Sequence, residues 1–397
     1  MTFFGEHPWT RWVAPVAALG LIGGSAVVTN QQADADPGLP SRTAAQLLAD
    51  VRSADVAALS GTVVQTVDLG LPQLPGLTGG AGPGGPRAGA SDGDSGMSSL
   101  ATLLTGSHTW RVWLDGPTRQ RLALIDGSNE TDLIHHGNDL WVWSSADKSA
   151  VHRRIPTLMH PLGPGQDTRG PADLSPTVPR TPKEAASRAL ALIGDDTTVT
   201  TSGTASVAGR AAYELVLTPK DSATRVASVR IAIDGRRHIP VRVQVYSTKL
   251  ANPAFQVGFT SIDFGRPDAS IFAFTPPPGT KVTDKGTLTL PVHPSRKGAT
   301  NPAPAAPGRL QGPTVVGSGW SAVLVGRLPL TAADRGTAGD PRSWLDGIRF
   351  SLPRVMGSWG RGRLLEGTLF SVVFTDGGRV AVGAVAPAQL YAALAAT

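Results

Sequence analysis

The stretch RVASVRIAIDGRRHIPVRVQVYSTKLANPAFQVGFTSIDFGRPDASIFAFTPPPGTKV, residues 225–282, decides the fold of this chain. Apolar residues alternate with polar ones in three successive segments: Val229, Ile231, Ile233; Ile239, Val241, Val243, Val245; and Phe255, Val257, Phe259. A period of two in β-branched and aromatic residues predicts strands that bury one face. Arg230, Arg242 and Gln244 fall on the opposite side, which favours a half-exposed antiparallel sheet. The three prolines at 275–277 predict the end of that sheet, because they remove three backbone donors.

The composition excludes several kinds of site and partner. The chain has 397 residues, enough for two or three domains, and no cysteine. Disulfides, thiolate metal sites and a catalytic thiol are therefore excluded. The net charge of +6 comes from scattered arginines, so no nucleic-acid partner is predicted.

Residues 1–35 are predicted to be a signal peptide or an N-terminal membrane anchor. Val13 to Val28 is apolar apart from Ser25, with Arg11 in front and Ala33-Asp34-Ala35 as a small-x-small cleavage site. The run of about 16 residues is shorter than the ~20 of a spanning helix, which favours cleavage without excluding an anchor. Either outcome predicts an extracytoplasmic protein, secreted or anchored to the cell membrane.

The remaining chain is predicted to divide into three parts. Residues 36–282 form a binding domain with a disordered Gly-rich insert at 70–106, 283–313 a Pro-rich linker, and 314–397 a small C-terminal α+β domain. Within them the apolar periodicity predicts amphipathic helices at Thr43–Leu59, Thr181–Ile193 and Trp344–Met356, and a closing helix from Pro387. Between the first two helices alternating segments predict strands: Thr62–Leu69, His108–Leu114, Arg119–Ile125, Glu130–His136, Asp139–Ser144 and Ala150–Ile155.

No enzyme is predicted, and neither a cofactor nor a metal. Gly89-Ala-Ser-Asp-Gly93 matches a hydrolase motif but lies in a Gly/Ser tract without the strand and helix that a nucleophile elbow needs. His135 and His136 point to opposite faces of a strand and have no visible third ligand.

The ordered set of elements resembles the LolA/LolB/RseB superfamily, including MucB-RseB-like proteins. The resemblance covers Thr43 to Val282 and rests on Thr109-Trp-Arg-Val-Trp-Leu-Asp-Gly-Pro, Leu140-Trp-Val-Trp, Ile233-Asp-Gly, Ile239-Pro-Val-Arg-Val and Phe272-Ala-Phe-Thr-Pro-Pro-Pro-Gly. The segment 364–386 resembles the tail of LolA-like proteins from high-GC Gram-positive, actinobacterial organisms. The resemblance implies an α+β fold: an incomplete antiparallel β-barrel lidded by helices, followed by a small C-terminal α+β domain.

The resemblance also implies a function, the binding of lipid or lipoprotein acyl chains in the concave face. The residues expected to line that cavity, or else simply to pack between sheet and helices, are Trp110, Val112, Trp113, Leu122, Trp141, Trp143, Ile231, Val243, Phe255, Val257 and Phe259. In the carrier an arginine on an early strand bonds a lid carbonyl, so the lid contacts expected here are Arg111, Arg119 or Arg121, together with Leu47, Leu48 and Val51. The alternative is an RseB/MucB-like sensor that binds a membrane partner, an anti-sigma factor or an ABC transporter. The Gly-rich insert and the C-terminal domain depart from the Gram-negative carrier.

Overall fold

The structure is a computed structural model that describes residues 39–71, 106–155, 181–190, 194–287, 311–327 and 351–397. The predicted export segment lies outside these ranges, as does almost all of the Gly-rich insert. None of the helices in the described ranges is both long enough and apolar enough to span a membrane.

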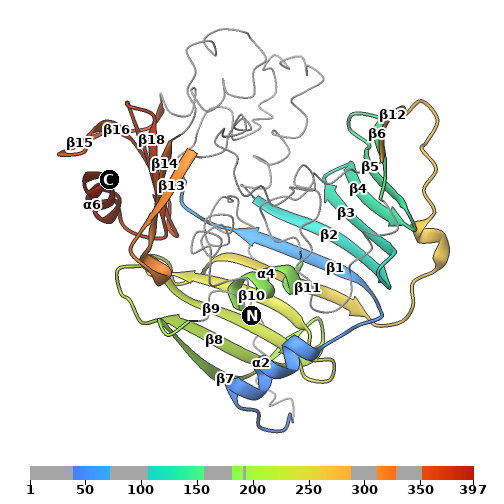
Figure 1. Ribbon diagram of the computed structural model, residues 1–397. Coiled ribbons are helices and arrows are strands. Elements are labelled where there is room, and N and C mark those ends of the chain that lie inside the picture. The colour runs from blue at the N-terminus through green and yellow to red at the C-terminus, as the bar shows by residue number, and fades with distance from the viewer. Residues whose placement is uncertain (1–38, 72–105, 156–180, 191–193, 288–310, 328–350) are drawn as a thin grey trace, which may run out of the picture.

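The larger of two sheets has twelve strands in the order β12-β6-β5-β4-β3-β2-β1-β11-β10-β9-β8-β7 (Figure 1). Every neighbouring pair in it is antiparallel except β12 with β6. The strands are β1 Ala58–Val67, β2 Gly106–Asp115, β3 Arg119–Asp126, β4 Asn129–His136, β5 Asp139–Ser144, β6 Ser149–Arg154, β7 Thr197–Val207, β8 Arg210–Pro219, β9 Val226–Asp234, β10 Pro240–Ser247, β11 Pro253–Asp263 and β12 Lys281–Thr287.

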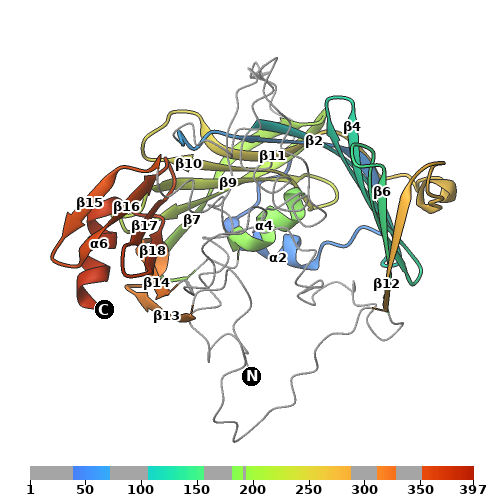
Figure 2. The same ribbon diagram turned by 90° about the horizontal axis from the view of Figure 1, so that it is seen from above.

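This sheet curves without closing, and two helices lie inside the curve (Figure 2). They are α2, Ala44–Ser53, and α4, Pro182–Leu190. We call the face that carries them the inner face and the opposite one the outer face. The predicted α+β fold with an open, helix-lidded half-barrel is confirmed.

The smaller sheet has six strands in the order β13-β14-β18-β17-β16-β15. They are β13 Gln311–Val316, β14 Val323–Arg327, β15 Arg354–Gly357, β16 Gly360–Glu366, β17 Ser371–Thr375 and β18 Arg379–Gly383. Helix α6, Pro387–Ala396, closes the chain and buries Leu390 and Leu394 against this sheet. The predicted closing helix is therefore confirmed.

Two predicted helices are wrong in extent. The first ends at Ser53 instead of Leu59, because β1 begins at Ala58, where it pairs with Asp115 of β2. The predicted helix Trp344–Met356 is replaced at its end by β15, which pairs with β16. Residues 344–350 lie outside the described ranges. In both places pairing with a neighbouring strand outweighs the local apolar periodicity.

The three prolines do not end the large sheet. The chain leaves β11, crosses the outer face as the segment 264–280, and returns as β12 beside β6 (Figure 1). Within this crossing segment the short helix η2, Ala269–Phe272, packs on β3 and β4 and buries Phe272 completely. The predicted domain boundary at 282 falls inside β12, and the division of the chain into domains stays a prediction.

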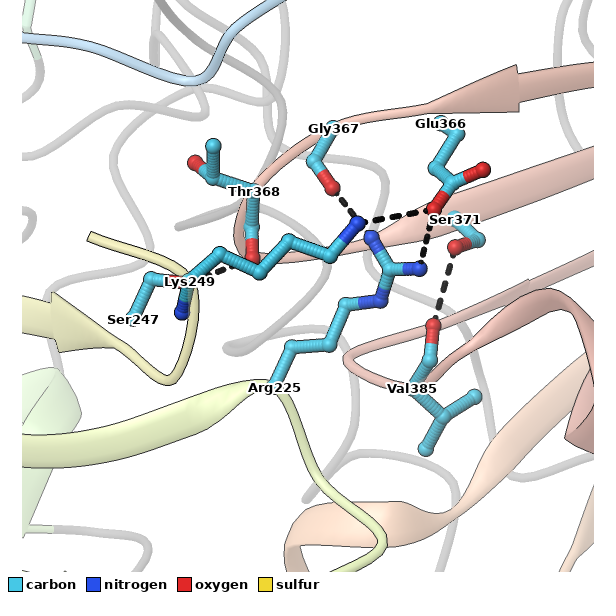
Figure 3. Close-up of polar contacts among 8 residues, drawn as sticks. All are labelled: Arg225, Ser247, Lys249, Glu366, Gly367, Thr368, Ser371 and Val385. Atoms are coloured by element: carbon cyan, nitrogen blue, oxygen red, sulfur yellow. Dashed lines mark hydrogen bonds and ion pairs between the residues drawn. The ribbon is translucent and has the colours of Figure 1, made fainter.

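A buried arginine joins the two sheets. Arg225 is only 4% exposed; its Nη1 donates to the carbonyl of Gly367 and its Nη2 to Oε1 of Glu366 at 2.5 Å (Figure 3). Lys249 Nζ donates to the same Oε1 at 2.9 Å. These hydrogen bonds hold the pKa of the Glu366 carboxyl below its ordinary value. Ser247 Oγ donates to the carbonyl of Thr368 at 2.7 Å.

The apolar core is continuous across the same junction. Trp320, Leu369 and Phe370 of the smaller sheet belong to the core cluster that fills the inner face of the larger one. Trp320 Nε1 donates to Thr197 Oγ1 at 2.8 Å, which satisfies the indole inside this core. The two sheets are therefore expected to unfold together.

Arg225→Met tests that junction. The change removes the donor to the Gly367 carbonyl and one of the two donors to Glu366 Oε1, and it should lower the free energy of unfolding by about 1–3 kcal/mol. Lys249→Met removes a half-exposed cation from the same carboxylate and should cost less than about 1 kcal/mol. Urea unfolding followed by fluorescence measures both. Equal, small losses would show that the buried guanidinium does not hold the sheets together.

Candidate functional site

The inner face of β9, β10 and β11 is a continuous apolar surface. In the ladder Ile231 lies opposite Val243, and Val243 opposite Val257. Phe255 and Phe259 flank Val257 on the same side of β11, and the exposed fractions of all five side chains lie between 0% and 7%. These five residues are brought together as the alternation predicted.

The apolar surface continues across β1 and β2. Val63 lies between Phe259 of β11 and Trp110 of β2. Trp110 and Val112 are buried in the same core cluster. These two predicted lining residues therefore share one face with the β11 row.

Beyond β2 the inner face remains apolar but is covered less. Leu122 lies opposite Leu133, Leu133 opposite Val142, and Val142 opposite Val151. All four side chains are only half-buried. Helices α4 and α2 pack mainly on β7, β10 and β11, which leaves this row less well covered.

The two helices pack on the inner face with different side chains. Leu47 of α2 is fully buried, and Leu48 and Val51 pack against the same core. Helix α4 faces the sheet with small side chains, since Ala185, Ala186 and Ala189 are its buried residues in the core cluster. An alanine side chain buries less apolar area than a leucine side chain, so each of these alanine contacts of α4 with the sheet is small.

Two buried polar side chains, Gln65 and His108, lie opposite each other within this apolar surface. Gln65 of β1 points to the inner face between Val257 and His108 and is 0% exposed. Among the described residues neither its Oε1 nor its Nε2 has a hydrogen-bond partner. An unsatisfied buried amide costs about 1–3 kcal/mol, so such a group calls for an explanation. Sequence reasoning missed Gln65, although its place in the alternating run of β1 made it the one polar residue on the buried side.

The other three tryptophans of the predicted lining lie on the outer face. Trp113 alternates with Trp110 and Val112, and therefore points away from them. Trp141 and Trp143 contact Phe274 of the crossing segment, with ring centroids 5.4 and 6.2 Å apart. The prediction that one cavity is lined by all these residues is wrong. Trp113, Trp141 and Trp143 face the side of the sheet opposite to Trp110 and Val112, because neighbouring positions of a strand point to opposite faces.

The three candidate lid arginines also act on the outer face. Arg111 lies 5.0 Å from the ring centroid of Trp113, and Arg119 pairs with Asp115 at 2.6 Å. Arg121 does donate to a main-chain carbonyl, that of Ile271 at 3.3 Å, but this carbonyl belongs to the crossing segment and not to α2 or α4.

Arg121 also pairs with a fully buried carboxylate on the outer face. Its Nη2 lies 2.5 Å from Asp132 Oδ2 and 3.5 Å from Glu130 Oε1. Asp132 Oδ1 has no hydrogen-bond partner among the described residues. Burial raises the pKa of Asp132 from 3.8 to about 6, and the bond to Arg121 offsets this only in part.

A shallow hollow on the large sheet also lies on the outer face. It has a volume of about 260 Å³ and its walls include Arg111, Trp113, Gly61 and Asp263. The inner face, by contrast, is packed against its helices. A ligand on the inner face would therefore have to displace a helix or use the half-buried row of β3 to β6.

The Asp132 pKa predicts how stability depends on pH. Because the folded-state value lies above the ordinary one, the folded protein binds this proton more tightly, and the resulting stabilisation is lost as pH rises from about 4 to about 6. Relative to Asp132→Asn, the wild type should lose about 2 kcal/mol between pH 4 and pH 7. Urea unfolding across this range measures the difference. Parallel pH profiles for the two proteins would contradict it.

No protein-family model matches the sequence, and no curated protein matches it. Among solved structures the chain is similar to MucB in the Pseudomonas aeruginosa MucA/MucB complex, at 16% identity and a TM-score of 0.40, covering 89% of this chain and 96% of that one. It is also similar to a LolA superfamily protein from Nitrosomonas europaea, at 11% identity and a TM-score of 0.20, covering 59% of this chain and 99% of that one. Structures of both kinds that the sequence resemblance indicated are thus among those to which the fold is similar.

Proposed function

We propose that this chain is an extracytoplasmic, non-enzymatic binding protein that holds an acyl chain of a lipid or lipoprotein on its inner face, as a carrier does. The observation that carries the proposal is the buried Gln65 amide, which has no hydrogen-bond partner among the described residues and lies beside the buried His108 within a largely apolar surface. An acyl chain needs such a combination, because it is apolar along its length and joined to its head by an ester or amide.

The chemistry of the surface fits each part of that ligand. Nε2 of Gln65 can donate to an ester or amide carbonyl, and Oε1 can accept from an amide N–H. The neighbouring rows of valine, isoleucine and phenylalanine provide apolar contact for the methylene groups, each worth about 0.8 kcal/mol when buried. The half-buried row from Leu122 to Val151 extends this surface toward β6.

Helix α4 is the element that a ligand on the inner face would displace. The stability of a helix in a protein comes mostly from the tertiary packing of its apolar face, so the order of α4 depends on packing. That packing consists largely of alanines on β10 and β11. An acyl chain on the inner face would replace this small contact by a larger one.

Native mass spectrometry and lipid extraction of the purified full chain test the proposal. We expect co-purified lipid, or uptake of a synthetic diacylated lipopeptide by the emptied protein, with one ligand per chain. A protein that is consistently empty and also refuses the lipopeptide would refute acyl binding.

Gln65→Leu separates binding from stability. The change removes an unsatisfied buried amide, so it should raise the free energy of unfolding by about 1–3 kcal/mol while weakening lipopeptide binding about ten-fold. Gln244→Leu is the matched control: Gln244 lies on the outer face, and its Nε2 donates to Gln256 Oε1 at 2.6 Å. That control should lower stability and leave binding unchanged. A loss of stability in Gln65→Leu as large as in the control would refute the assignment.

The alternative, a sensor that binds an anti-sigma factor or another membrane partner, is favoured by the continuous core between the inner face and the smaller sheet. A ligand that moves the inner face would act directly on Trp320 and Phe370. Co-purification from membranes, with and without lipopeptide, distinguishes the two. A specific partner whose capture changes with lipopeptide supports the sensor, and capture of none supports the carrier.

A further inference from the structure

One end of the smaller sheet gathers three arginines from three strands. Arg327 ends β14 and lies directly opposite Arg379, which begins β18. Arg361 lies near the start of β16, where its carbonyl accepts a hydrogen bond from Asp376 N at 3.0 Å. These arginines are far apart in sequence, and they meet because the ends of β14 and β17 and the starts of β16 and β18 lie at the same end of the sheet.

These arginines surround a hollow of about 340 Å³. Its walls are formed by their side chains and by Trp359, Gly360, Thr375, Asp376 and Gly377. Three guanidinium groups against one carboxylate make the hollow strongly cationic.

Folding does not require this concentration of charge. Arg327 and Arg361 are exposed and form no ion pair among the described residues, and only Arg379 has a structural role, donating to the carbonyl of Leu394 at 2.8 Å. Like charges directly opposite each other on neighbouring strands are destabilising, so the pair Arg327 and Arg379 weakens the sheet that carries it. A group that neutralises both would remove this repulsion.

The walls of the hollow are held in place. Trp359 stacks on Tyr391 of α6, with ring centroids 5.5 Å apart and planes inclined by 22°. Thr375 Oγ1 accepts from Arg379 N at 2.8 Å and donates to Arg379 O at 3.0 Å. A ligand would therefore meet a surface that is already ordered on two sides.

We propose that this hollow binds a phosphate group. Guanidinium groups match the oxygens of phosphate in paired hydrogen bonds, and a phosphate has enough acceptors to serve three arginines at once. The single Asp376 leaves the hollow with an excess of two positive charges, which suits a phosphate mono- or diester. The site lies at one end of the smaller sheet and does not depend on the inner-face ligand proposed above.

Arg327→Gln/Arg361→Gln in the full chain tests the proposal against Arg354→Gln. Arg354 is the matched control, since it is exposed on β15 of the same sheet but outside the hollow. Calorimetric titration with inorganic phosphate, and co-sedimentation with phosphatidylcholine vesicles with and without phosphatidylglycerol, measure binding at low salt. Unfolding temperatures without ligand verify that each variant folds.

We expect the double variant to lose phosphate binding by about ten-fold or more, and the control to match the wild type. Without ligand the double variant should unfold at the wild-type temperature or above it, because repulsion between Arg327 and Arg379 has been removed. Vesicle binding that requires phosphatidylglycerol and is competed by phosphate assigns a lipid headgroup. Phosphate binding without vesicle binding assigns a soluble phosphate compound. Equal binding by all three proteins, or an equal loss in the control, overturns the proposal.

Discussion

A twelve-stranded sheet has two faces, and the apolar side chains on each must be kept from water. Different elements of the protein cover the two faces. Helices α2 and α4 lie on the inner face, and the crossing segment 264–280 lies on the outer face of β3 to β5 (Figure 2). The sheet is open because its two edge strands, β12 and β7, do not pair with each other.

The smaller sheet is part of the same cover. Trp320, Leu369 and Phe370 extend the inner-face core, and Arg225 is desolvated between the two sheets. A buried cation is tolerated only when it is paired and hydrogen-bonded, and Glu366 and the carbonyl of Gly367 meet that need. The smaller sheet is therefore held against the larger one by these hydrogen bonds, which lie within a shared apolar core.

Three features stand out because they oppose stability. Gln65 is an unsatisfied amide in the inner-face core, Asp132 a carboxylate whose pKa burial has raised, and Arg327 and Arg379 are like charges side by side. A sequence selected for stability alone would replace them, since apolar or neutral residues of similar size fit. Two of these features lie where a ligand of matching chemistry would relieve the cost: an ester or amide at Gln65, and a phosphate at the arginines.

The sequence alone predicted the fold class, most strands of the larger sheet and the buried sides of β9, β10 and β11, because alternation along one strand is a local property. It placed Ile231, Val243 and Phe255 on one surface correctly for that reason. Only the tertiary structure decided which neighbour each face meets. Trp141 and Trp143 look like cavity residues in sequence, yet they face Phe274, because the crossing segment takes the outer face. The burial of Gln65 and the meeting of Arg327, Arg361 and Arg379 likewise depend on strands distant in sequence becoming neighbours, and local periodicity carries no information about such pairings.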